Sequence, residues 1–116
     1  MKLVLVLTTE ANQAKAEALA AQLLEQRLAA CIALQPQQSL YHWQGRIERD
    51  SEVQLLIKTS FERLEALQIA LHKIHSYEVP EWIVLPAECS ESYGSWLISS
   101  LKPPHPEPGD AAAPRL

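Results

Sequence analysis

Glycine and cysteine are scarce in this chain, and each scarcity excludes a class of site. The three glycines stand alone at positions 45, 94 and 109, so there is no glycine-rich loop of the kind that cradles phosphate groups. The two cysteines, Cys31 and Cys89, lie far apart and show no metal-ligand spacing. A single disulfide between them is arithmetically possible, but we expect two reduced thiols in a cytoplasmic protein.

Clusters of basic residues and long apolar runs are also missing. Ten Lys and Arg residues stand against 14 Asp and Glu residues, and the net charge of −4 argues against the basic face of a general nucleic-acid binder. The apolar run Leu3–Leu7 is shorter than the roughly 7–15 residues of a signal-peptide core. No run approaches the roughly 18 residues of a membrane span. We therefore expect a cytoplasmic protein that binds neither nucleic acid nor membrane.

Catalytic motifs are not recognisable. The chain has no Ser-His-Asp pattern with a nucleophile elbow. An acylphosphatase-type enzyme would carry an arginine in the loop after the first strand, whereas Thr8–Asn12 contains neither a basic residue nor a glycine. We therefore expect no enzymatic activity and no required cofactor.

Residues 39–59 predict a long β-hairpin. Gln44 and Gly45 separate two runs of alternating and β-branched residues, and the glycine supplies the positive φ of a two-residue turn. In this register Tyr41 and Trp43 share one face of the ribbon. The predicted opposite pairs are Trp43 with Arg46, Tyr41 with Glu48, and Ser39 with Asp50.

The hairpin is long for a domain of this size. Each arm of about a dozen residues would measure about 40 Å, so the ribbon would overhang its own globule. An overhanging ribbon needs another surface, and a second copy of the chain is the simplest candidate. The alternative is that Pro36 interrupts the strand predicted at residues 30–35 and that the hairpin has an ordinary length.

The whole pattern predicts one α+β domain over residues 1–102. The further elements expected are strands at 3–8 and 82–85 (the latter ended by Pro86), helices at 11–28 and 59–74 capped by Thr9 and Thr59, and a last helix at 90–101. The order βαββαβ predicts a ferredoxin-like sandwich with an extra C-terminal helix. The proline-rich segment 103–116 is predicted to be a disordered tail.

Two histidines are candidate metal ligands. His72 and His75 are three residues apart and share one face if the second helix extends through both, which is a two-ligand spacing for a transition metal. The alternative is a solvated helix end at which a cationic histidine offsets the helix dipole.

A second candidate site combines polar and aromatic side chains near the hairpin. We expect Glu52, Lys58, Tyr77 and Glu78, beside the aromatic Tyr41 and Trp43, to line a cleft between subunits. The alternative is a set of exposed ion pairs and capping bonds, worth about 0–1 kcal/mol each.

An ordered set of motifs resembles the CutA family of divalent-cation tolerance proteins. The matching segments are Leu28–Cys31, Ser39–Gly45, Asp50–Glu52, Ile57–Thr59, His75–Glu81 and Tyr93–Leu97. The resemblance implies a ferredoxin-like subunit in a homotrimer similar in build to the P-II signalling proteins. It also implies a role in tolerance to copper and other divalent metals, with no established enzymatic activity.

The copper ligands of the family are only partly present. Members credited with copper binding place a cysteine at the end of the first strand and a His-His pair before Pro-Tyr. The matching positions here hold Thr8, Ile74, His75 and Ser76, so only His75 remains, and His72 is a substitute one turn earlier.

Three functional hypotheses follow. The first is a cytoplasmic homotrimer in the response to divalent metal ions that binds copper or another divalent cation weakly. The second is a P-II-like small-molecule sensor or scaffold that uses the cleft between subunits. The third is a structural trimer that acts through a partner protein.

Overall fold

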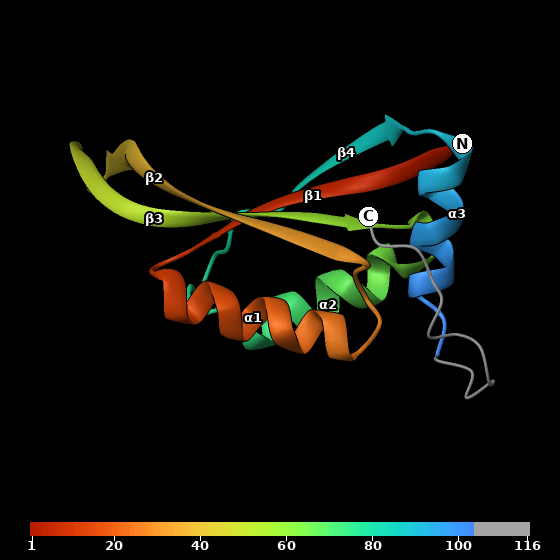
Figure 1. Cartoon of the computed structure of the whole chain (residues 1–116). Helices are drawn as coiled ribbons and strands as arrows, with labels where there is room; N and C mark the ends of the chain where they lie inside the picture. Colours follow the sequence, from red (N-terminus) through yellow and green to blue (C-terminus); the bar gives the residue numbers. More distant parts are fainter. Residues whose placement is uncertain (104–116) are drawn as a thin grey trace.

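The computed structural model describes residues 1–103 as a four-stranded antiparallel sheet with two helices on one face and a third at one end (Figure 1). In chain order the elements are β1 (Lys2–Glu10), α1 (Gln13–Glu25), β2 (Cys31–Trp43), β3 (Arg46–Thr59), the 3₁₀ turn η1 (Phe61–Arg63), α2 (Leu64–Ile74), β4 (Ile83–Glu88) and α3 (Glu91–Ser100). The strand order β2-β3-β1-β4 confirms the ferredoxin-like prediction. Within the described residues no helix is long and apolar enough to cross a membrane. The tail predicted from residue 103 lies outside the described residues from 104 onward.

The core lies between the sheet and the pair α1 and α2. Alternate strand residues face the helices, and the fully buried side chains include Val4, Val6, Leu55, Ile57, Leu19, Leu23, Leu67 and Leu71. Burying each such leucine contributes about 1.5–3 kcal/mol. A smaller cluster forms where α3 packs on the other face, around Leu3, Leu97 and Leu101. Beyond α3 that face stays open, with Ile83 and Leu85 43% and 44% exposed.

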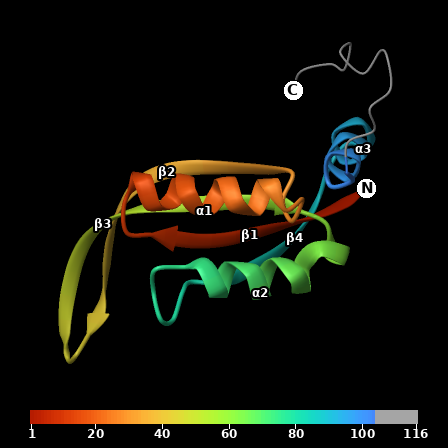
Figure 2. The ribbon, with the colours of Figure 1, turned by 90° about the horizontal axis from the view of Figure 1, so that it is seen from below.

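The hairpin overhangs the domain, as predicted. β2 and β3 pair from Cys31 opposite Lys58 to Trp43 opposite Arg46, and the three predicted opposite pairs are confirmed. β1 borders β3 only over residues 53–59, so the outer part of the ribbon has no neighbouring strand. The ribbon bends away from α1 and α2 in Figure 1 and extends past the ends of both helices in Figure 2, and the molecule measures 58 × 27 × 24 Å. The ribbon is the part of the hairpin formed by residues 37–52.

Two prolines that were expected to end strands lie inside them. Pro36 sits opposite Val53 within an uninterrupted β2, and Pro86 sits opposite Val4 within β4. The predicted interruption and strand end are therefore wrong. The reason is that β2 and β4 are the two edge strands of the sheet, where a residue without an N–H is tolerated.

The predicted starts of the first two helices are also wrong. Thr9 belongs to β1, paired with Gln54, and the cap of α1 is Asn12, whose Oδ1 accepts a hydrogen bond from the Lys15 N–H at 2.9 Å. Thr59 ends β3 and donates its hydroxyl to the Leu28 carbonyl at 2.7 Å. In both cases the threonine is itself paired within a strand, so its hydroxyl is not available at a helix start. α3 begins after Ser90, as predicted.

The backbone conformation of the turn at the tip of the hairpin restricts which residues can occupy it. Gln44 and Gly45 have φ values of 49° and 77°, which is the left-handed region at both central positions of the turn. No atom lies within 4 Å of a Cβ added at Gly45. Gly45→Ala should therefore lower stability by about 1–2 kcal/mol through backbone strain alone. Gln44→Asn should raise stability by a few tenths of a kcal/mol, because asparagine tolerates the left-handed region better.

Thermal unfolding at one fixed protein concentration measures both changes. Unchanged stability in Gly45→Ala would mean that the turn relaxes to another geometry and would contradict the predicted strain.

Candidate functional site

A groove forms where the ribbon meets the loop between α2 and β4. Its volume is about 780 Å³. The ribbon contributes Tyr41, Trp43, Asp50 and Glu52, β1 contributes Thr9, and the loop contributes residues Ser76, Tyr77, Glu78, Val79, Pro80 and Glu81. Five of the six residues predicted to line an inter-subunit cleft, all except Lys58, are thus brought together within one chain.

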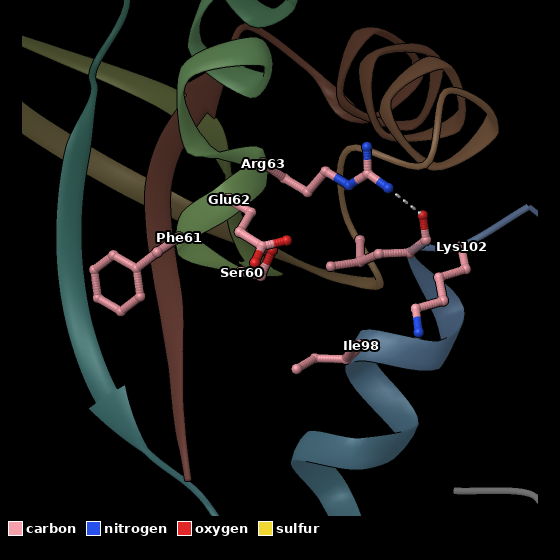
Figure 3. Close-up of a pocket in the computed structure, with 7 residues that line it drawn as sticks. Ser60, Phe61, Glu62, Arg63, Ile98 and Lys102 are labelled. Atoms are coloured by element: carbon pink, nitrogen blue, oxygen red, sulfur yellow. Dashed lines mark hydrogen bonds between the residues drawn. The ribbon is translucent and has the colours of Figure 1, made fainter.

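A smaller pocket of about 230 Å³ lies between η1 and the end of α3. Figure 3 shows Arg63 reaching across it, where its guanidinium donates to the Leu101 carbonyl at 2.8 Å. The guanidinium of Arg63 is therefore engaged in holding η1 and α3 together. We take the larger groove as the candidate site, because its volume suits a small molecule and the predicted residues converge there.

The ribbon wall of the groove is built by strand alternation. Tyr41 and Trp43 are two residues apart on β2 and therefore point to the same face, together with Asp50 and Glu52 of β3. The Tyr41 hydroxyl donates a hydrogen bond to the Asp50 carboxylate. That bond raises the pKa of Tyr41 to about 12. The phenol is therefore a fixed hydrogen-bond donor at neutral pH.

The loop is attached to this wall by one hydrogen bond. The Tyr77 hydroxyl donates to Oε2 of Glu52 at 2.9 Å. Burial, then this bond to a carboxylate, raise the pKa of Tyr77 above its usual range. Tyr77 therefore stays protonated and connects the loop to the ribbon across the groove.

Behind Tyr77 the loop is anchored by a buried pair, Glu10 and His75. The side chain of His75 is fully buried; its Nε2 donates to the Thr9 carbonyl at 2.6 Å and its Nδ1 accepts from the Tyr77 N–H at 2.9 Å. The Glu10 carboxylate is 2% exposed and accepts from the N–H groups of Ala11 and Ser76, each at 3.0 Å. These bonds fix the loop to the end of β1.

The two candidate metal ligands are not brought together. α2 ends at Ile74, so His75 leaves the helix and points into the core, while His72 stays exposed and donates from Nδ1 to the Gln68 carbonyl at 2.9 Å. Both imidazole nitrogens of His75 are engaged, which leaves no lone pair for a metal ion. Among residues 1–103 no group of three or more His, Cys, Asp or Glu is arranged to hold a metal ion. Metal binding at these histidines stays a prediction.

Lys58 does not reach the groove of its own chain. It follows Glu52 by six residues along β3, which separates their Cα atoms by about 20 Å. Its Nζ donates to the Tyr93 hydroxyl of α3 at 3.2 Å, and this bond raises the pKa of Lys58. Lys58 therefore connects the sheet to α3.

Sequence reasoning missed two carboxylates of the groove, Asp50 and Glu81. Alternation with Glu52 was a usable signal for Asp50. Glu81 gave no such signal, because only the fold of the loop aims it here. Its Oε2 is buried and has no hydrogen-bond partner among the described residues. Burial first, then the nearby charge of Glu52, raise the pKa of Glu81.

The raised pKa of Glu81 makes stability depend on pH. The native state holds this proton more tightly than the unfolded state, so the contribution of Glu81 is present at low pH and is lost as pH rises through its native pKa. Glu81→Gln should therefore raise the melting temperature by about 2 °C at pH 7, and the gain should shrink toward pH 4.

Thermal unfolding between pH 4 and 8 tests this, with Glu65→Gln on the exposed surface of α2 as the matched control. A gain in Glu81→Gln that is the same at both ends of the range would show that the charge of Glu81 carries no penalty.

Comparison with known proteins assigns a family to this fold. A family model described as CutA1 divalent ion tolerance protein matches residues 4–100. The divalent-cation tolerance protein CutA of Pectobacterium atrosepticum is 46% identical over 101 residues, which cover 85% of this chain and 92% of the relative.

Solved structures agree with that assignment. CutA from Synechococcus elongatus PCC7942 superposes with a TM-score of 0.82 at 43% identity, covering 87% of this chain and 91% of that one. The protein described as periplasmic divalent cation tolerance protein CutA from Archaeoglobus fulgidus gives 0.82 at 28% identity, covering 88% and 100%. The chain described here belongs to the CutA1 divalent ion tolerance protein family.

Proposed function

We propose that this chain acts as a cytoplasmic homotrimer in the tolerance of divalent metal ions, without catalytic activity. The observation that carries the proposal is membership of the CutA1 divalent ion tolerance family over nearly the whole described domain. Cys31 and Cys89 are both free thiols, which supports a reducing compartment.

Self-assembly is supported by the apolar surfaces that the single chain leaves open. On the ribbon Leu40 and Ile47 are 60% and 69% exposed on the face opposite the groove. Apolar side chains on a ribbon without neighbouring strands gain burial against another chain. A closed ring gives every copy the same contacts. Three copies is the number that likeness to the P-II build implies.

The link to metal ions is proposed to need no tightly held ion at the predicted histidines. The lone pair of His75 Nδ1 accepts the Tyr77 N–H, so a metal would have to break a buried bond to reach it. His72 is exposed and keeps Nε2 free of hydrogen bonds among the described residues. In this proposal His72 alone makes a weak surface contact with copper, because a single exposed imidazole is a poor site.

Native mass spectrometry of the full chain, with and without stoichiometric copper, tests assembly and copper contact together. We expect the mass of three chains of 13.0 kDa. Copper adducts should be few, and His72→Ala should reduce them while the exposed control His42→Ala should not.

Two outcomes would contradict the proposal. A monomer mass at micromolar concentration would remove the trimer. If the His72→Ala variant still binds copper at a fixed stoichiometry and the His75→Ala variant does not, the metal site lies at the buried histidine instead.

A second candidate function is a small-molecule sensor or scaffold of the P-II type, and the groove is the observation that favours it. Its volume of about 780 Å³ lies within the usual range for ligand sites. A ligand that binds the folded state and not the unfolded state raises the melting temperature, and the rise grows with the logarithm of its concentration above Kd. A small molecule that does so in wild type and fails to do so in Trp43→Ala would support this function.

A further inference from the structure

The charge of the groove restricts what it can bind. Its lining holds four carboxylates, those of Asp50, Glu52, Glu78 and Glu81, and no Lys, Arg or His. Among these lining residues a phosphate or carboxylate ligand would find no positive partner and would meet like charge. Arg46, opposite Trp43 on the same face, is paired with Glu48. Nucleotides and organic acids are therefore disfavoured, and the complementary ligand carries positive charge.

The groove is lined by aromatic side chains as well as by carboxylates. Tyr41, Trp43 and Tyr77 line the same space. The hydroxyls of Tyr41 and Tyr77 donate hydrogen bonds to Asp50 and Glu52, and these bonds hold the two carboxylates in place. Each carboxylate keeps further lone pairs that can accept from a ligand. An indole face beside carboxylates is the combination that recognises an ammonium or guanidinium group.

An independent observation comes from Glu81. Glu81 lines the groove, and its Oε2 is buried and has no hydrogen-bond donor among the described residues. Buried polar atoms are rarely left without a partner. Burial, and after it the nearby charge of Glu52, raise the pKa of Glu81. An N–H donor with positive charge between the two carboxylates would satisfy both groups.

The shape of the site favours an organic cation over a metal ion. The acidic side chains of the described residues are not gathered into a group of three that could hold an ion. They are distributed along a groove of small-molecule size, with a half-exposed indole on the ribbon wall. A flexible chain with several ammonium groups matches separated carboxylates better than one point charge does.

We propose that this groove binds a small aliphatic polyamine, with an ammonium group between Glu52 and Glu81 and the chain against Trp43. The proposal rests on the second candidate function and names its ligand class. We expect the ligand to be a free small molecule, because the volume of the groove fits one. The experiment below distinguishes this from a groove that is filled by a side chain of a neighbouring copy.

Isothermal titration of the full chain with spermidine tests the proposal. At near-physiological salt we expect one binding event per chain. Glu52→Gln keeps the acceptor for Tyr77 and removes only charge, and it should weaken binding about tenfold. Trp43→Ala should weaken it about fivefold. Glu65→Gln, a charge removed from the exposed surface of α2, should leave the affinity unchanged.

Every other result overturns the ligand assignment in a distinguishable way. Equal affinity in Glu52→Gln and Glu65→Gln, or equal stabilisation by Mg²⁺ at matched ionic strength, would mean general screening of an acidic protein. Binding of a nucleotide but not of spermidine would retain the sensor function and reject the cation. No binding, together with dissociation of the trimer in Trp43→Ala, would mean that a neighbouring copy fills the groove.

Discussion

The pairing of β2 with β3 is the interaction on which the rest of the molecule depends. Its inner part, residues 31–36 against 53–58, supplies the central strand that β1 joins and the apolar face that α1 and α2 cover. Its outer part continues the same ladder past the edge of the domain. One register therefore sets both the core and the ribbon, and a shift by one residue would turn Tyr41 and Trp43 to the opposite face.

The ribbon alone does not make the groove, because its second wall is an irregular loop. That loop needs its own anchors, and it has them in the buried Glu10 and His75 behind Tyr77. The chain of contacts runs from the end of β1 through His75 to Tyr77 and then to Glu52 on β3. A polar pair in the core therefore acts as a support for the site, and the histidine that looks like a metal ligand serves to orient the loop.

Sequence alone predicted what depends on local periodicity. Alternation around Gln44 and Gly45 was enough for the hairpin, its register and the shared face of Tyr41 and Trp43. The predicted interruption at Pro36 was wrong, because whether a proline ends a strand depends on where that strand lies in the sheet. The contacts of His75 could not be predicted, since they join residues 66 positions apart. The separation of Lys58 from Glu52 could have been foreseen from the strand rise alone.

A family named for metal tolerance and a groove suited to organic cations are compatible. A fold assigns no chemistry by itself; the side chains of the site do that. Here the carboxylates stand apart along an aromatic wall, and the buried imidazole has both nitrogens engaged, so neither feature favours tight capture of a metal ion. In our proposal the role in metal tolerance therefore needs no tightly held ion, and the groove serves an organic cation, because its carboxylates are not gathered around one centre.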